Sequence, residues 1–429
     1  MAQYTSGLGP TEAIVPYVMT SSKISNARQR QTVLGANCAT HAVQDGLSAT
    51  TYVLLPILAQ TLGLTYTQVG IFKGVKNVAQ GLLELSSGVA SERFGERALL
   101  VIGLALAGIG YVCLSFSSSA YAVLVSLLIV GIGGAYQHAP ASALVSRAYI
   151  AGGRRGALGL YNSMGDAGKL VFTGCFGLAV ATGMNWPTVA LAYGLFTVVA
   201  AVGVHLALGS VGAGLAYRPK TGGGLTAGSV ATGWGILDRR GFSALLAAVF
   251  LDGMVQAGAM TFMAFVMVEK GLPLAIATFA AVALLVGGMC GKAVCGFLAE
   301  RIGVRTAFTI AQVLTALGLL AVLVVPGGMA YVLLPIVGIA LQGSTSITYG
   351  MVDDLVHADR TTRGFALVYA AASFASVAGP VGFGAIADAA GINTALIAMA
   401  VVAAATIVPG LLLRVPTKLD MATGSGTQT

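Results

Sequence analysis

Charged residues are scarce in this sequence: Asp, Glu, Lys and Arg together make up 9% of the 429 residues. Soluble domains carry about 25%. Hydrophobic residues make up 56%, and the mean hydropathy is +0.86. Because a chain so poor in charge cannot cover a large water-facing surface, an ordinary soluble enzyme is excluded. Long apolar runs in such a chain predict an all-α integral membrane protein.

Several other signals are also missing. The five cysteines lie mostly in apolar runs and form no disulfide framework: Cys38, Cys113, Cys175, Cys290 and Cys295. No G-x-x-x-x-G-K-[ST] loop occurs, which disfavours an ATP-driven pump. Residues 1–31 are polar and show no signal-peptide pattern. The sequence predicts no enzymatic activity, no cofactor and no resident metal.

The apolar runs predict twelve transmembrane helices. We place them at 32–59, 66–91, 97–117, 121–148, 156–180, 187–209, 242–268, 273–299, 305–325, 329–352, 363–387 and 392–414. Most of the 23 Lys and Arg residues lie in the tails or in alternate loops, whereas Lys270 lies in a loop on the other side. This asymmetry predicts that both termini are cytoplasmic. Since the net charge of +8 is spread along membrane flanks, we expect no nucleic-acid partner.

Two stretches half a chain apart are copies of one another. Residues 88–97 and 296–305 both read G-x-x-x-E-R-x-G-x-R, and each lies between two apolar runs. Gly95 and Gly303 suit a tight turn at this point. Asp45 and Asp252 recur at a similar offset in the first and seventh helices. The chain therefore consists of two parallel repeats.

The repeated pattern resembles the loop signature of the major facilitator superfamily, between its second and third helices and again between its eighth and ninth. The resemblance covers nearly the whole chain, although the family usually has Asp where Glu92 and Glu300 stand. It implies two pseudo-symmetric six-helix bundles around a central cavity, with alternating access. It also implies a conformational gate formed by Gly88, Glu92, Arg93, Arg97, Gly296, Glu300, Arg301 and Arg305. We expect Arg97 and Arg305 to pair with the two glutamates, which lie near helix ends that disfavour negative charge.

These observations divide the chain into five parts. They are a cytoplasmic tail at 1–31, a bundle at 32–209, a cytoplasmic linker at 210–241, a second bundle at 242–414 and a cytoplasmic tail at 415–429. The linker is rich in Gly and Thr, as flexible linkers are.

Ionisable and polar residues inside the spans are the candidates for function, because they are costly in a bilayer unless they face a cavity or a partner. We predict that the solute is bound by Lys73, Lys76, Asn77, Gln80, Gln137, His138, Asn162, Lys169, Gln256, Gln342 and Tyr349. We predict that proton coupling involves Asp45, His41, Asp166 and Asp252. Structural alternatives stay open: Asp166 and Lys169 can neutralise each other, and Glu84 and Lys292 can be ion-pair members near the inner gate.

Lys73 and Lys76 favour an anionic solute. They lie one helical turn apart, so they cannot neutralise each other, and an anion would supply the missing countercharge. Our first hypothesis is therefore proton-coupled uptake of a small organic anion by a monomeric protein, in the inner membrane of a bacterium.

Two further hypotheses remain. His41-Ala-Val-Gln-Asp45 and Gln137-His138-Ala-Pro140 resemble the fosmidomycin-resistance branch of the superfamily, which implies proton-antiport export of a drug or metabolite. The Gly-Pro pair that antiporters carry in the fifth helix is missing there and stands at 379–380 instead. Cys38, His41 and Asp45 share one helix face, with His138 as a candidate opposite, which suits a metal or metal-chelate cargo. A membrane receptor is a fourth, non-transporting alternative.

Overall fold

The computed structural model describes residues 26–149, 154–215, 234–356 and 361–413. These residues form α-helices and no strand, apart from an isolated bridge between Ile236 and Val356. The first repeat contains α1 (Ala27–Leu62), α2 (Tyr66–Phe94), α3 (Glu96–Ser115), α4 (Ala120–Gly134), α5 (His138–Ala148), α6 (Arg154–Ala181) and α7 (Trp186–Ser210). The second contains α8 (Arg239–Glu269), α9 (Leu274–Ala277), α10 (Ala280–Ile302), α11 (Val304–Val324), α12 (Gly327–Gly350), α13 (Val352–Leu355), α14 (Thr361–Ala390), α15 (Ile392–Ala405) and α16 (Ile407–Leu412).

The twelve predicted spans are confirmed as helical within the described residues. The fourth span is α4 with α5, the eighth is α9 with α10, and the twelfth is α15 with α16. In the described part of the chain, 10 helices are long and apolar enough to cross a membrane. The other two spans, α1 and α2, are less apolar because they carry many of the polar side chains described below.

Proline explains two of the interrupted spans. Pro140 lies at the start of α5 and Pro409 at the start of α16. A proline ring lacks an N–H and clashes with the carbonyl four residues earlier. The preceding helices α4 and α15 accordingly end at Gly134 and Ala405. The fourth span is thus interrupted before Pro140, and His138 lies at the first turn of α5.

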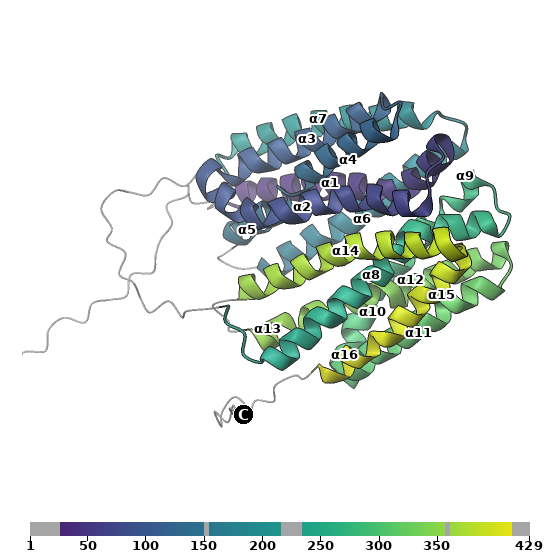
Figure 1. Cartoon of the computed structure of the whole chain (residues 1–429). Coiled ribbons are helices and arrows are strands. Elements are labelled where there is room, and N and C mark those ends of the chain that lie inside the picture. The colour runs from purple at the N-terminus through teal and green to yellow at the C-terminus, as the bar shows by residue number, and fades with distance from the viewer. Residues whose placement is uncertain (1–25, 150–153, 216–233, 357–360, 414–429) are drawn as a thin grey trace, which may run out of the picture.

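The helices form two bundles, one built from α1–α7 and the other from α8–α16 (Figure 1). They meet where α2 packs against α14, α1 against α8, and α6 against α10. Glycine allows this close contact: a Cβ at Gly70 or Gly384 would collide with backbone atoms of the opposite bundle. The outer helix α7 exposes Leu195, Phe196, Val199, Val202 and Leu206, which suits contact with lipid.

The two repeated loops have the same backbone geometry. Gly95 joins α2 to α3 with φ 84° and ψ 147°, and Gly303 joins α10 to α11 with φ 86° and ψ 149°. These positive φ values favour glycine, so the predicted turns are confirmed. Residues 1–25, 216–233 and 414–429 lie outside the described residues, and the five domain limits stay predictions.

Candidate functional site

A cavity of about 260 Å³ lies between the two bundles. Sites for drug-sized ligands usually measure about 300–1,000 Å³, so this volume suits a small solute. Its polar lining comprises Asp45, Ser48, Tyr52, Lys169, Asp252, Gln256, Gln342, Thr345, Thr348, Tyr349 and Ser376. Among the predicted residues, Asp45, Lys169, Asp252, Gln256, Gln342 and Tyr349 thus share one cavity.

Alternating charges run from α1 through α6 to α10, and two of them, Asp45 and Lys169, line the cavity. Lys169 Nζ lies 3.0 Å from Asp45 Oδ2 and 3.2 Å from Asp166 Oδ1. Lys292 Nζ lies 2.7 Å and 2.8 Å from the two carboxylate oxygens of Asp166. The pairing of Asp166 with Lys169 occurs as the sequence suggested, and Lys292 joins it from the other bundle. We call Asp45, Lys169, Asp166 and Lys292 the charge chain.

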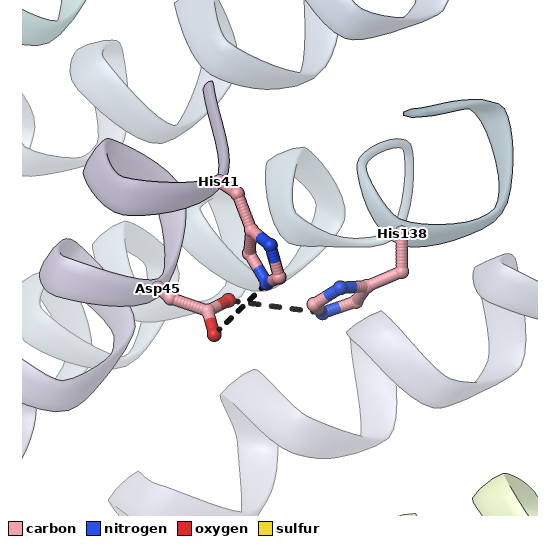
Figure 2. Close-up of side chains that lie close together, drawn as sticks. All are labelled: His41, Asp45 and His138. Carbon is pink, nitrogen blue, oxygen red and sulfur yellow. Dashed lines mark ion pairs between the residues drawn. The ribbon is translucent and has the colours of Figure 1, made fainter. Parts of the chain in front are cut away.

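Two histidines approach Asp45, one from its own helix and one from α5 (Figure 2). His41 Nε2 lies 3.3 Å from Asp45 Oδ2, and His138 Nε2 lies 3.8 Å from Asp45 Oδ1. The Nδ1 atom of His41 lies 2.8 Å from the carbonyl oxygen of Tyr161. Since a carbonyl only accepts, Nδ1 donates, and Nε2 is the atom that faces Asp45. Cys38, which the sequence placed on the same face, is not part of this described group.

Asp252 has different surroundings, although it occupies the equivalent position in the second repeat. Gln312 Nε2 donates to its Oδ1 at 2.8 Å, and Ser344 Oγ and Gln256 Nε2 donate to its Oδ2 at 2.7 Å and 2.8 Å. Among the described residues no Lys, Arg or His lies within ion-pair distance of Asp252. The residues predicted from the sequence did not include Gln312, which lies on α11, the ninth span.

Lys73 and Lys76 are buried behind the cavity wall. Lys73 Nζ donates to Thr51 Oγ1 at 3.0 Å and lies 3.7 Å from the centre of the Tyr52 ring. Lys76 Nζ donates to Ser48 Oγ. Neither lysine has a carboxylate partner in the described structure. The cavity is lined by Ser48 and Tyr52, and the two ammonium groups lie one layer behind them.

Four other predicted solute-binding residues lie outside the cavity lining, and two of them make hydrogen bonds elsewhere. Gln137 Nε2 donates to the hydroxyl of Tyr161 at 3.1 Å, and Asn77 Nδ2 donates across the bundle interface to the carbonyl of Ser376 at 3.1 Å. Gln80 is half-buried and Asn162 is exposed. They lie outside the cavity lining.

In the second repeat, the gate residues do not form the expected pair between Glu300 and Arg305. Arg305 Nε donates to the carbonyl of Leu413, while Glu300 is exposed and has no ion pair in the described part of the chain. That expected pairing was wrong, because the C-terminal end of α16 offers a free helix carbonyl. Glu96, at the start of α3, pairs with Arg147 at 2.5 Å.

Arg93 and Arg301, which occupy equivalent positions in the two repeats, each lie over a neighbouring phenylalanine ring. The guanidinium of Arg93 lies over the Phe94 ring at 5.4 Å, and that of Arg301 over the Phe297 ring at 4.7 Å. The backbone N–H of Arg97 donates to the carbonyl of Gly214 at 2.9 Å. Gly296 faces Ser346 of α12, whereas the surroundings of Gly88 and the side chain of Glu92 lie outside the described structure.

Comparison with known proteins identifies the family. The sequence model of the Major Facilitator Superfamily matches residues 38–293 and 245–428. The chain belongs to this superfamily. It is an integral membrane transporter for small molecules and not an enzyme.

Curated relatives are similar over part of their length. An uncharacterised transporter of the superfamily, YfnC of Bacillus subtilis, is 29% identical over 30% of this chain and 31% of its own. The fosmidomycin resistance protein of Escherichia coli is 28% identical over 33% of this chain and 34% of its own. The chain thus matches about a third of the length of these relatives.

Solved structures are similar over nearly the whole chain. A bacterial homologue of the human lysosomal transporter Spinster, in an inward-facing and unoccupied conformation, has a TM-score of 0.75 at 16% identity and covers 90% of this chain and 96% of its own. A point mutant of the nucleoside transporter NupG has a TM-score of 0.70 at 11% identity and covers 89% and 99%. At these identities the likeness establishes the fold.

Proposed function

We propose that this chain is a proton-coupled secondary transporter that exports a small polar solute through the cavity between its bundles. Asp252 is the group that binds and releases the coupling proton. The observation that carries this proposal is that Asp252 lies in the cavity wall with neutral hydrogen-bond donors around it and, among the described residues, no cation beside it.

A buried carboxylate without a countercharge is expensive, and binding a proton removes that charge. The donors to Asp252 are Gln256 on α8, Gln312 on α11 and Ser344 on α12, and Tyr349 lines the same cavity. The Oε1 atom of Gln312 is buried without a hydrogen-bond partner among the described residues. Rotation of the Gln312 side-chain amide by half a turn would let Oε1 accept from the O–H of protonated Asp252. The site can therefore hydrogen-bond both the ionised and the protonated form of Asp252.

The other residues predicted to couple protons lie beside groups of opposite charge, which stabilise their ionised forms. Lysines neutralise Asp45 and Asp166 within the charge chain, and His41 faces Asp45. These contacts support a structural role for the charge chain and leave proton exchange to Asp252.

The cavity lining favours a polar solute of low charge. Lys169 is the cation in the lining, and two carboxylates already contact it. Export is supported by the name of the fosmidomycin resistance protein and by two multidrug resistance proteins MdtH, which are 30% and 28% identical over 22% of this chain. Bacterial relatives and the basic loops support a bacterial inner membrane with cytoplasmic termini.

Uptake of an organic anion is a second candidate, and Lys73 and Lys76 favour it. Both ammonium groups are buried with neutral oxygen partners. An anion in the cavity would lie one layer away, beyond Ser48 and Tyr52, so its attraction to the lysines would be weaker than that of a direct ion pair.

Transport assays in membrane vesicles test the proposal. In inside-out vesicles with an acidic lumen, a proton antiporter accumulates solute in the lumen, whereas a proton symporter drives solute out of it. The solutes tested are carboxylates, phosphonates and drugs. Asp252→Asn should abolish accumulation driven by the pH gradient but retain solute exchange, since exchange needs no net proton release. Asp238→Asn, which removes a carboxylate at the start of α8, is the matched control. Unchanged gradient-driven accumulation in Asp252→Asn would refute the coupling role.

A further inference from the structure

The cluster of His41, Asp45 and His138 contains a contact between two acceptors. The Nδ1 atom of His41 donates its hydrogen to the Tyr161 carbonyl, so the Nε2 atom of a neutral ring carries a lone pair. That lone pair lies 3.3 Å from Asp45 Oδ2, an oxygen that can only accept when the carboxylate is ionised. Two facing acceptors repel, and a cation between them removes the repulsion. The cation is either a proton or a metal ion.

The geometry points to a metal ion as one occupant. We propose that His41, Asp45 and His138 form a binding site for a divalent transition-metal ion, with His41 Nε2, one Asp45 oxygen and His138 Nε2 as ligands (Figure 2). This site shares Asp45 with the lining of the solute cavity, but it does not depend on the proposed coupling at Asp252.

The three ligand atoms are already close to a coordinating arrangement. They all lie within 4.8 Å of one another. Metal–ligand bonds of about 2.1 Å separate neighbouring ligand atoms by roughly 3–3.5 Å, and the two His–Asp distances are 3.3 Å and 3.8 Å. Because His138 is more exposed than His41, a small side-chain rotation of His138 can close the remaining gap.

The surroundings orient the ligands as metal sites do. Metal-binding histidines commonly donate their second N–H to a backbone carbonyl, which fixes the ring and directs the other nitrogen to the ion. His41 has this arrangement with Tyr161, and its ring also packs against the Tyr161 ring at a centroid distance of 4.2 Å. Two imidazoles with one carboxylate favour ions such as Zn²⁺, Ni²⁺, Co²⁺ or Fe²⁺ over Mg²⁺ and Ca²⁺.

The positive charge of Lys169 disfavours a metal ion at Asp45, but Lys169 can pair with Asp166 instead. Its Nζ lies 3.0 Å from Asp45 Oδ2 and 3.2 Å from Asp166 Oδ1. A bound metal would therefore move Lys169 toward Asp166, while Asp45 Oδ1, which faces His138, is free to ligate. The ion and Lys169 thus compete for one carboxylate, so we expect moderate rather than very tight affinity.

The test uses untagged, metal-free protein in detergent, titrated with Co²⁺ by visible absorption and with Zn²⁺ by calorimetry. We expect one ion per chain, and His138→Ala should weaken binding at least tenfold. His205→Ala is the matched control, because it removes an exposed histidine of α7 and should leave affinity unchanged. Cys38→Ser, one turn before His41, should also bind normally.

Asp45→Asn gives a second measurement. It should likewise weaken binding at least tenfold, and thermal unfolding without metal verifies that each variant is folded. If the parent protein binds no ion, or if His138→Ala and Asp45→Asn bind as tightly as the parent, the proposed metal site is refuted and a proton is the occupant.

Discussion

Lys292 Nζ contacts both carboxylate oxygens of Asp166, at 2.7 Å and 2.8 Å, and so joins α10 of one bundle to α6 of the other. Alternating access requires the two bundles to move relative to each other. This ion pair must therefore lengthen or exchange partners during the cycle, and Lys169 is the partner that Asp166 retains.

Removing this pair should loosen the contact between the bundles. We expect Asp166→Asn and Lys292→Gln to be coupled by about 1 kcal/mol in a double-mutant cycle of thermal unfolding, since the pair is partly exposed. Spin labels placed on the two bundles should also report longer separations in both variants. Lys270→Gln is the control, because Lys270 binds the carbonyls of Leu323 and Val325 within one bundle. Additive effects in the cycle would show that the pair does not stabilise this conformation.

Asp388 forms a second link between the bundles. Its carboxylate accepts from the backbone N–H groups of Tyr66 and Thr67 at 2.8 Å each and from the Thr67 hydroxyl at 2.5 Å, so a residue of α14 caps the start of α2. Asp388→Ala should remove about 1 kcal/mol of capping and increase thiol labelling of cysteines introduced at this end of the contact between α2 and α14. The control is Asp238→Ala, which removes a cap within one bundle. Equal labelling in both variants would contradict a role in closure.

The repeated glycine turns give a test of backbone strain alone. A Cβ at Gly303 would meet no atom within 4 Å, but its φ of 86° is unfavourable for other residues. Gly303→Ala should therefore lower the free energy of unfolding by about 1–2 kcal/mol. Gly35→Ala in α1 also meets nothing within 4 Å and should be neutral or stabilising. Thermal unfolding in detergent measures both, and equal stability of the two variants would contradict the turn assignment.

Removing the charges of Lys73 and Lys76 tests whether either lysine pairs with an acid inside the protein. In the described structure their partners are neutral oxygens and a ring, so Lys73→Gln and Lys76→Gln remove a buried charge without leaving a carboxylate unpaired. We expect the free energy of unfolding, measured without solute, to change by less than about 1 kcal/mol in each variant. A loss of roughly 3 kcal/mol or more, on the order found when a buried ion pair is broken, would reveal an internal acid partner. If the solute is anionic, its affinity should also fall in both variants.

Much of the fold follows from local sequence. The apolar runs define the twelve spans because a helix satisfies its backbone hydrogen bonds within one segment. The repeated pattern predicts the turns at Gly95 and Gly303, and Pro140 accounts for the interruption of the fourth span that the structure shows, since each depends on one residue's backbone. The repeat also predicts that Asp45 and Asp252 occupy equivalent places, and both line the cavity.

The tertiary structure decided which charges meet. Asp45 and Asp252 match in the sequence, yet Lys169 of α6 contacts the first carboxylate, while amide and hydroxyl groups from α8, α11 and α12 surround the second. The same packing placed Lys73 and Lys76 behind the cavity wall and paired Lys292 with Asp166. These outcomes depend on the rotation of each helix about its axis and on its neighbours in the other bundle, which the order of residues along one helix does not specify.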